Sequence, residues 1–370
     1  MNSETSGATR RDFLAQSGAA LLTLAAATTF PHAAAAASES VEKADPENMP
    51  TDPIRLGNGA HSYDCVNDWL TPPETIKWGD THGVAQDAKG RIYISHTVRA
   101  DSPSSDAIVV FDKNGKFLTS WGSQFKGGGH GLDIRREGRQ EFLYHCDVAH
   151  SKVVKTDLDG KVIWEKGTPV EAGVYDATHK FVPTNVALTA HGDFYVGDGY
   201  GSSYIHQYDG KGEYIRTFGG PGKEPGKVST PHGLWIDTRK GIGTGGEPLL
   251  VVADRGNRRL QYFTLDGKHV RFVTEGMRQP CHFDIRGDEL LVPDLDSVVT
   301  ILDKNNEVIV HLGDGAVNGN PSGLRGAPRA QFIPGKFIHP HSAKFLHNGD
   351  ILVVEWVPIG RVTLLRKVTA

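Results

Sequence analysis

Histidine recurs at the first position of a short motif that is repeated along this chain of 370 residues. The six copies are separated by 48, 55, 47, 50 and 59 residues and begin at His82, His130, Asn185, His232, His282 and His341. Neutral imidazole is the commonest protein ligand for divalent transition metals. Histidines at one position of a repeat therefore predict a metal site wherever the repeats converge.

Six side chains cannot all bind one ion. Alternate copies fall into two sets of three, namely His130, His232 and His341, and His82, Asn185 and His282. Three histidines that leave one position open are typical of catalytic zinc. The all-histidine set is the predicted metal site, and His82 and His282 are additional candidate ligands. The alternative interpretation is structural, with each histidine only forming a hydrogen bond to a neighbouring repeat.

A regular series of β-rich runs follows each motif and must position it. In the first unit the runs include 92–94, 108–111 and 117–121, and Asn114-Gly115 separates the last two. Asn-Gly between alternating runs is a strong hairpin signal. Four runs per unit, six units and a period near 50 residues predict an all-β fold, a six-bladed β-propeller with four-stranded antiparallel blades. Because the first strand of each blade lines the central channel, the six motifs are expected to meet there.

Two further expectations concern the edges of this propeller. The last unit lacks a fourth run, and segment 63–69 precedes the first unit, so this segment is predicted to be the outer strand of the last blade. Segments 219–230 and 313–335 are rich in glycine and proline and are predicted to be loops over one face.

An acidic residue ends most of the second runs. These residues are Asp147, Asp198, Asp254, Asp294 and Glu355, with His96 in the first unit. Such acids usually cap loops or pair with a nearby arginine, and this structural role is the preferred interpretation. The alternative is that they orient the metal-binding histidines.

The motifs resemble NHL repeats and, more closely, the peptidyl-α-hydroxyglycine α-amidating lyases. The resemblance covers roughly residues 75–365 and rests on the segments His130-Gly131-Leu132, Pro231-His232-Gly233-Leu234, Pro340-His341, Asp198-Gly199-Tyr200 and Ala253-Asp254-Arg255-Gly256-Asn257. It implies a six-bladed propeller with zinc on the three histidines. It also implies that Tyr200 takes a proton from the substrate hydroxyl, that Arg255 holds the substrate carboxylate, and that the reaction gives a peptide amide and glyoxylate.

The sequence departs from that family at several places. Ser342 replaces an aspartate that is a calcium ligand in the family, so the resemblance gives little support for Ca²⁺. His339 replaces a methionine and is a candidate for an extra metal ligand or a catalytic base. The family's first-blade arginine aligns with Thr97, and Arg99 is its nearest substitute.

The N-terminal residues indicate export. Arg10 and Arg11 precede an apolar stretch at 18–30 and an alanine run, which is typical of a twin-arginine signal peptide over 1–37. The alternative is a general secretory signal that happens to contain two arginines. Residues 38–52 are predicted to be a linker and 53–370 the propeller, in a periplasmic or extracellular protein.

Composition excludes several classes of partner. The net charge of -4 does not favour nucleic acid or an anionic membrane surface, and after the N-terminus no apolar run is long enough to span a membrane. The three cysteines, Cys65, Cys146 and Cys281, allow at most one disulfide and no CxxC zinc site.

The preferred hypothesis is an exported, metal-dependent propeller enzyme. It would cleave a small-molecule or peptide-derived substrate bearing a carboxylate or amide, using Zn²⁺ or another transition metal. The alternative is a non-catalytic NHL-type binding or scaffold propeller of the cell envelope, with Arg325 and Arg329 in a recognition loop. A lactonase-like propeller is disfavoured because imidazole is a poor calcium ligand. The oligomeric state does not follow from the sequence.

Overall fold

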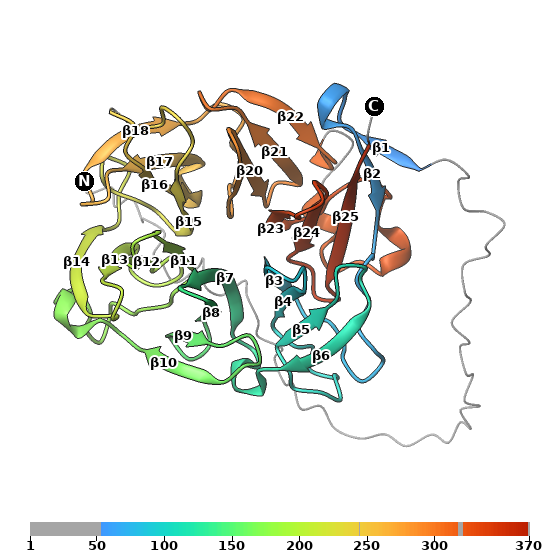
Figure 1. The fold of residues 1–370 in the computed structure, drawn as a ribbon, viewed down its shortest axis with the longest axis horizontal. Coiled ribbons are helices and arrows are strands. Elements are labelled where there is room, and N and C mark those ends of the chain that lie inside the picture. Colours follow the sequence, from blue (N-terminus) through green and yellow to red (C-terminus); the bar gives the residue numbers. More distant parts are fainter. Residues whose placement is uncertain (1–52, 244, 317–320, 369–370) are drawn as a thin grey trace, which may run out of the picture. The chain divides into compact units, whose positions relative to one another are not determined.

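The computed structural model describes residues 53–243, 245–316 and 321–368 (Figure 1). The predicted signal peptide (1–37) and linker (38–52) lie outside the described residues. Within the described ranges the helices are 3-10 turns of three or four residues, and the remaining regular structure is β-strand.

Six antiparallel sheets surround a common axis, with β3, β7, β11, β15 and β23 innermost (Figure 1). The first three blades are formed by β3 (Thr81–Gln86), β4 (Ile92–His96), β5 (Ile108–Phe111) and β6 (Phe117–Trp121); β7 (Gly129–Glu137), β8 (Gln140–Asp147), β9 (Lys152–Thr156) and β10 (Val162–Lys166); and β11 (Asn185–Leu188), β12 (Phe194–Gly197), β13 (Tyr204–Tyr208) and β14 (Tyr214–Gly219).

The other three blades are β15 (Pro231–Asp237), β16 (Leu249–Asp254), β17 (Arg259–Phe263) and β18 (His269–Val273); β19 (Asp284–Arg286), β20 (Glu289–Asp294), β21 (Val298–Leu302) and β22 (Val308–Leu312); and β23 (Pro340–Phe345), β24 (Ile351–Glu355) and β25 (Arg361–Lys367), which continue into β2 (Tyr63–Val66) and β1 (Ile54–Leu56). The predicted six-bladed propeller with four-stranded blades is confirmed.

Local sequence explains why these strands form and where they turn. The middle strands are continuous apolar runs, such as β5, whose four residues are all buried between neighbouring blades. The turns between the outer strands use glycine in the left-handed region, with φ of 83° at Gly115 and 88° at Gly267. That conformation is disfavoured for residues with a Cβ atom, so these glycines fix the hairpin register.

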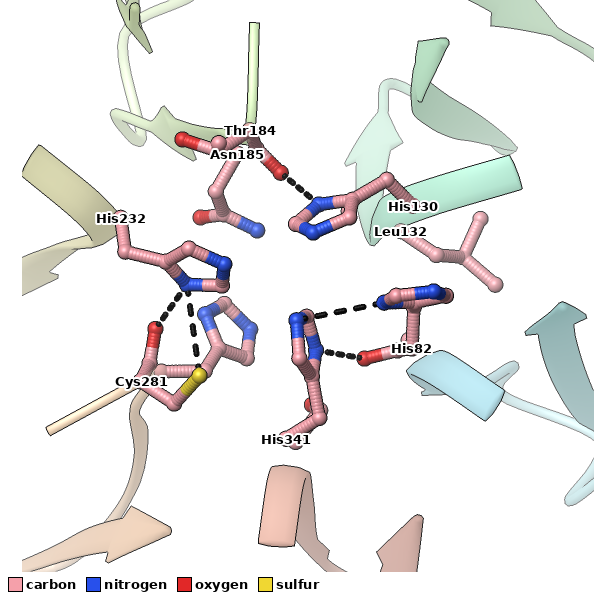
Figure 2. Close-up of a pocket in the computed structure, with 12 residues that line it drawn as sticks. His82, His130, Leu132, Thr184, Asn185, His232, Cys281 and His341 are labelled. Carbon is pink, nitrogen blue, oxygen red and sulfur yellow. Dashed lines mark hydrogen bonds between the residues drawn. The ribbon is translucent and has the colours of Figure 1, made fainter. Parts of the chain in front are cut away.

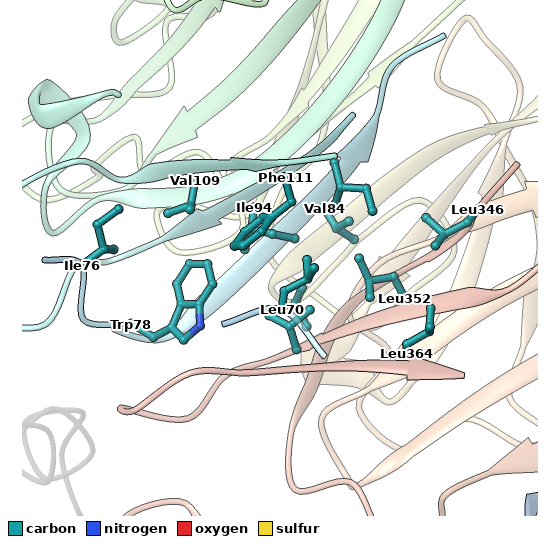
Figure 3. Close-up of a cluster of buried hydrophobic side chains, with 13 residues drawn as sticks. Leu70, Ile76, Trp78, Val84, Ile94, Val109, Phe111, Leu346, Leu352 and Leu364 are labelled. Atoms are coloured by element: carbon teal, nitrogen blue, oxygen red, sulfur yellow. The ribbon is translucent and has the colours of Figure 1, made fainter. Parts of the chain in front are cut away.

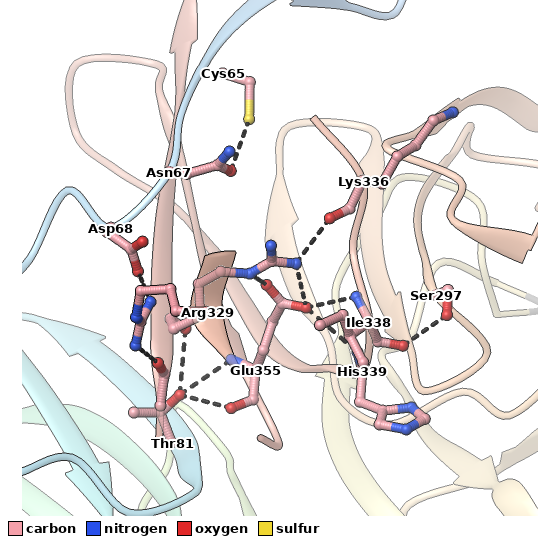
Figure 4. Close-up of polar contacts among 12 residues, drawn as sticks. Cys65, Asn67, Asp68, Thr81, Ser297, Arg329, Lys336, Ile338, His339 and Glu355 are labelled. Carbon is pink, nitrogen blue, oxygen red and sulfur yellow. Dashed lines mark hydrogen bonds and ion pairs between the residues drawn. The ribbon is translucent and has the colours of Figure 1, made fainter. Parts of the chain in front are cut away.

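The propeller is closed by a strand from the start of the described chain. As predicted, β2 pairs antiparallel with β25, so that Cys65 lies opposite Leu365. β1 was not predicted, and it adds a fifth strand to blade 6. The ion pair between Arg361 and Glu355 is buried beside this junction (Figure 4). The same Glu355 carboxylate accepts a hydrogen bond from the Ile338 amide at 2.7 Å, so it links β24 and β25 to the approach to β23.

Apolar side chains fill the space between adjacent blades. Between blades 6 and 1, Val84, Ile94 and Phe111 pack against Leu352 and Leu364, together with Trp78 (Figure 3). Each such side chain contributes about 1.5–3 kcal/mol when it is fully buried. The same packing recurs between the other blades, so the angle of each first strand toward the axis is fixed by its neighbours.

The residues that end the second strands hold the loops in place. Asp198 accepts hydrogen bonds from the amides of Val182 at 2.7 Å and Ser202 at 2.6 Å. Asp294 accepts from the Arg278 amide at 2.9 Å in the equivalent position of blade 5. The structural interpretation of these acids is therefore confirmed. In blade 1 the same role falls to His96, whose Nδ1 accepts from the amides of Gly79 at 3.1 Å and Val98 at 3.2 Å.

We expect His96 to make the propeller sensitive to acid. Burial lowers its pKa to about 4, and the hydrogen bond from Nε2 to the Asp106 carbonyl opposes this shift. Protonation of Nδ1 would remove the acceptor of both loop amides. The stability that neutral His96 provides is therefore complete above about pH 6.5 and decreases as the pH falls toward 4, by up to about 1.4 kcal/mol per pH unit.

Chemical unfolding of chelator-treated protein at a series of pH values tests this expectation. His96→Asn keeps an acceptor for the two amides but does not titrate. The free energy of unfolding of the wild type should fall relative to the variant between pH 6.5 and 4. Parallel pH profiles of the two proteins would contradict the role of His96.

Candidate metal centre

The histidines of the predicted threefold set lie together on the propeller axis (Figure 2). The ring centroids are 4.9 Å apart for His130 and His232, 4.6 Å for His130 and His341, and 4.7 Å for His232 and His341. Each of the three side chains is buried. Blades 2, 4 and 6 thus each direct one imidazole to the same point.

A β-bulge at the start of each first strand directs these side chains inward. The pairing register shifts between Gly129 and Leu132 in β7, between Pro231 and Leu234 in β15, and between Pro340 and Ser342 in β23. An extra residue in one strand re-aims the side chain at that position. In each case the histidine lies inside the bulge.

Glycine after the histidine permits the neighbouring blade to approach. A Cβ atom on Gly131 would lie 2.3 Å from the Thr184 carbonyl oxygen, and one on Gly233 would lie 2.4 Å from that of Cys281. Both distances are far below van der Waals contact, so a side chain at either position would push the blades apart. The repeated His-Gly pair therefore combines a ligand-type side chain with the closest approach between blades.

The three histidines share one pattern of hydrogen bonds. Their Nδ1 atoms lie 2.7 Å, 2.8 Å and 2.8 Å from backbone carbonyl oxygens of the next blade, in the pairs His130 with Thr184, His232 with Cys281, and His341 with His82. A carbonyl oxygen only accepts, so Nδ1 carries the proton and Nε2 of the neutral ring is an acceptor. This arrangement is typical of metal-ligating histidines.

The cavity between the imidazoles is small and buried. Its volume for water-sized occupants is about 10 Å³, close to the space needed for one water molecule or ion. Burial lowers the pKa of His130 to about 3, and it lowers the pKa of His232 and His341 well below the usual value. The rings are therefore neutral at pH 7 and their lone pairs are available.

Among the described residues, the groups of three ligand atoms that lie within 4.8 Å of one another are not the threefold set itself but two groups that each share two of its histidines. The nitrogens of His82, His130 and His341 lie within 4.8 Å of one another, as do the ligand atoms of His232, Cys281 and His341. His82 Nδ1 lies 3.2 Å from His341 Nε2. The histidine cluster could therefore bind a metal ion through more than one combination of ligands.

Tyr200 brings a hydroxyl group to the same point. Its oxygen lies 3.2 Å from His130 Nε2 and 3.0 Å from His232 Nε2. The residue follows β12, in a loop that Asp198 holds, and the Arg255 guanidinium carbon lies 5.2 Å from the centroid of its ring. Tyr200 as a whole is 42% exposed, but desolvation of its hydroxyl group beside the histidines raises the pKa of this tyrosine, while the positive charge of Arg255 opposes this shift. Tyr200 and Arg255 thus lie beside the histidines, as expected from the sequence.

Comparison with known proteins places this geometry in context. No protein-family model matches the chain. It is 29% identical to peptidyl-alpha-hydroxyglycine alpha-amidating lyase 1 of Drosophila melanogaster over 58% of this chain and 42% of the relative, and 26% identical to lyase 2 of the same organism over 78% and 71%. It is also 27% identical to NHL repeat-containing protein 3 of Homo sapiens over 54% and 55%. The chain thus spans less than half the length of the first of these relatives.

This chain is a six-bladed propeller that is similar to an NHL-repeat protein and to the amidating lyases. A solved structure described as streptogramin B lyase has a similar fold, with a TM-score of 0.54 and 12% identity over 83% of this chain and 99% of that one. Within the described residues of this chain, no helix is long and apolar enough to cross a membrane.

The propeller does not bring every candidate residue into the centre. His339 is not among the residues that line the histidine cavity. Its Nδ1 lies 2.6 Å from the Leu295 carbonyl oxygen, and its ring packs against Trp356. Arg99 is 37% exposed, pairs with Asp101 and is not among the residues that line the histidine cavity.

His282 and Asn185 line the cavity but differ from the threefold set. Nδ1 of His282 is buried without a partner among the described residues, and its Nε2 lies 3.9 Å from Asp133. The Asn185 side chain donates to Asp133 at 3.3 Å and accepts from the Leu234 amide at 3.3 Å. His282 thus keeps an available nitrogen, whereas both ends of the Asn185 amide are engaged.

Sequence reasoning missed Cys281 as a neighbour of the cluster. Its Sγ lies 3.4 Å from His232 Nδ1, and no disulfide joins the three cysteines of the propeller. Cys281 directly precedes His282, so comparison of the residue before each repeated histidine could have placed it beside the ring.

Proposed function

We propose that this propeller is a metal-dependent lyase that acts on a small N-acyl-α-hydroxyglycine, the class represented by peptidyl-α-hydroxyglycine, and cleaves the bond between the amide nitrogen and the carbon that bears the hydroxyl group. The observation that carries the proposal is the position of the Tyr200 hydroxyl between His130 Nε2 and His232 Nε2. This pairs a proton-transfer group with a set of imidazoles that have metal-ligand hydrogen bonding. The resemblance to the amidating lyases supports the same reaction class.

The donor set suits a transition metal. His130, His232 and His341 would hold the ion, because each is neutral and each Nδ1 lies against a backbone carbonyl oxygen. We propose Zn²⁺, while other borderline metals accept the same ligands. A bound ion would polarise an oxygen of the substrate and so favour loss of its proton.

Arg255 and Tyr200 would carry out the other steps, which are substrate binding and proton transfer. Arg255 would bind the substrate carboxylate through its planar fork. Tyr200, as the phenolate, would accept the hydroxyl proton while the C–O bond becomes a carbonyl and the C–N bond breaks. The same tyrosine would return that proton to the departing amide nitrogen. The products are a primary amide and an α-keto acid or aldehyde acid, and no oxidant is consumed.

We also propose that the protein is exported, on the basis of the twin-arginine pattern in residues 1–37. That route carries folded proteins, so the ion would be bound before transport.

We expect one transition-metal ion per chain and metal-dependent turnover. Elemental analysis of the protein isolated from its natural compartment should show stoichiometric zinc or a related metal. The purified protein should convert an N-acyl-α-hydroxyglycine to the amide and glyoxylate, lose this activity with chelator and recover it with added zinc. Absence of stoichiometric metal together with no turnover would contradict the proposal and favour the binding-module alternative.

A further inference from the structure

Cys281 adds a sulfur ligand to the histidine cluster. The residue lies at the start of blade 5, and its amide donates to the Pro293 carbonyl oxygen at 2.9 Å, which fixes its backbone beside β20. Its side chain is fully buried and lines the same cavity as His232 and His341 (Figure 2). Among the described residues, the ligand atoms of Cys281, His232 and His341 lie within 4.8 Å of one another. The cavity thus offers a group of two nitrogens and one sulfur.

Two N–H groups point at this sulfur. His232 Nδ1, which carries a proton toward the Cys281 carbonyl oxygen, lies 3.4 Å from Sγ and shares its proton with the sulfur. Arg255 Nη1 donates to the same Sγ at 3.6 Å. A thiol is a weak acceptor for such donors, whereas hydrogen bonds to an ionised acceptor are stronger. These surroundings would therefore stabilise the negative sulfur once an ion has displaced its proton.

The sulfur lies on one side of the cavity, across from His130. His130, His232 and His341 come from the alternate blades 2, 4 and 6, whereas Cys281 comes from blade 5, between the blades of His232 and His341. Figure 2 shows Cys281 and His130 on opposite sides of the cluster. An ion on Cys281, His232 and His341 would thus be displaced toward blade 5 and away from His130. Because the cavity has space for about one ion, only one of the two sets can be occupied at a time.

A second observation indicates that a ligand belongs on this side of the cavity. His282 follows Cys281 directly and lines the same cavity, and its Nδ1 is buried without a partner among the described residues. A buried polar atom without a partner is destabilising and indicates an ion or a water molecule beside it. The part of the cavity nearest to blade 5 is therefore suited to an occupant.

We propose that Cys281, His232 and His341 form a second metal-binding mode that selects thiophilic ions, the class represented by Cu⁺ and Cd²⁺. A soft thiolate ligand favours such ions, whereas three imidazoles suit zinc and other borderline metals. The ion forms bonds to the sulfur and to one nitrogen of each imidazole, and the thiol proton is released to solvent. This mode does not depend on the proposed lyase function. Because it uses His232 and His341, it excludes zinc from the threefold set.

Titration of chelator-treated full-length protein with Cd²⁺ tests the mode. A bond between cadmium and a thiolate produces a charge-transfer absorption band in the ultraviolet that imidazole ligands alone do not produce. We expect this band to saturate at one ion per chain. Cys281→Ser should abolish the band and lower the Cd²⁺ affinity at least about tenfold. Its zinc affinity should change only a few-fold, because the three imidazoles remain. The matched control is Cys146→Ser, which should keep the band, since Cys146 is also buried but does not line the cavity.

His130→Ala separates the two modes. It should lower the zinc affinity and keep the cadmium band, whereas His341→Ala should weaken the binding of both ions. A wild type without the band, a band that persists in Cys281→Ser, equal losses of Cd²⁺ and zinc affinity in Cys281→Ser, or loss of the band in His130→Ala would each overturn the inference. Unchanged zinc affinity in His130→Ala, or a wild type that shows the band but no turnover with zinc, would refute only the proposed function.

Discussion

His232→Ala should reduce the metal affinity of the propeller by about 100-fold or more. Residues that only orient a metal ligand contribute about 10- to 100-fold to affinity, and removal of a ligand should cost at least as much. The Cys281 carbonyl oxygen lies 2.8 Å from Nδ1 of His232, which leaves Nε2 of this ring available to the ion. Competition titration with a chromophoric chelator measures the loss.

The matched control for His232→Ala is His282→Ala. His282 lines the same cavity, but its Nδ1 has no partner among the described residues and its ring does not share the hydrogen-bond pattern of the threefold set. We expect its removal to change metal affinity only a few-fold. If both variants lose the same metal affinity, the ion is bound by a larger set of ligands than the threefold set. If His232→Ala keeps the metal content of the wild type, the proposed site is wrong.

Tyr200→Phe should retain the metal and lose turnover. The substitution removes only the hydroxyl group that lies 3.0 Å from His232 Nε2. A positioned proton-transfer group contributes about 10²- to 10⁴-fold to rate, so kcat on an N-acyl-α-hydroxyglycine should fall by this factor. Metal affinity should stay within a few-fold of the wild type, because the three imidazoles and their carbonyl partners are unchanged.

Tyr204→Phe is the control for the tyrosine variant. Tyr204 begins β13 in the same blade, and its ring lies against Tyr175, away from the cavity. The kcat of Tyr204→Phe should equal that of the wild type. If Tyr200→Phe keeps wild-type kcat, the hydroxyl is not the proton acceptor. If it loses metal as well as activity, Tyr200 contributes to ion binding instead.

Much of the fold could be predicted because its signals are local. The runs at 108–111 and 117–121 coincide with β5 and β6, and the run at 92–94 lies within β4. Alternation and turn dipeptides lie within a few residues of the strands that they define. The closing strand β2 also followed from the missing fourth run, whereas β1 had no such counterpart and was missed.

The site was less predictable because it depends on bulges and on distant contacts. His339 and His341 are two residues apart and would share one face of a regular strand. The register shift between Pro340 and Ser342 turns His341 toward the axis and leaves His339 against Leu295. Arg325 meets Asp80 across 245 residues of sequence, from the loop between β22 and β23. The repeat period of the blades therefore could not predict the contact between Arg325 and Asp80.

Blade 6 contains strands from both ends of the described chain, so it is the last blade to be completed during synthesis. The ribosome makes β2 before every complete blade, and its partner β25 is the last strand of the described chain to emerge. His341 belongs to this same blade, so a nascent chain can fold the blades that carry His130 and His232 while the third imidazole still lacks a finished sheet. The full ligand set is then available only after β23 to β25 have been made and β25 has paired with β2. Uptake of the ion would thus discriminate a completed propeller from a truncated one.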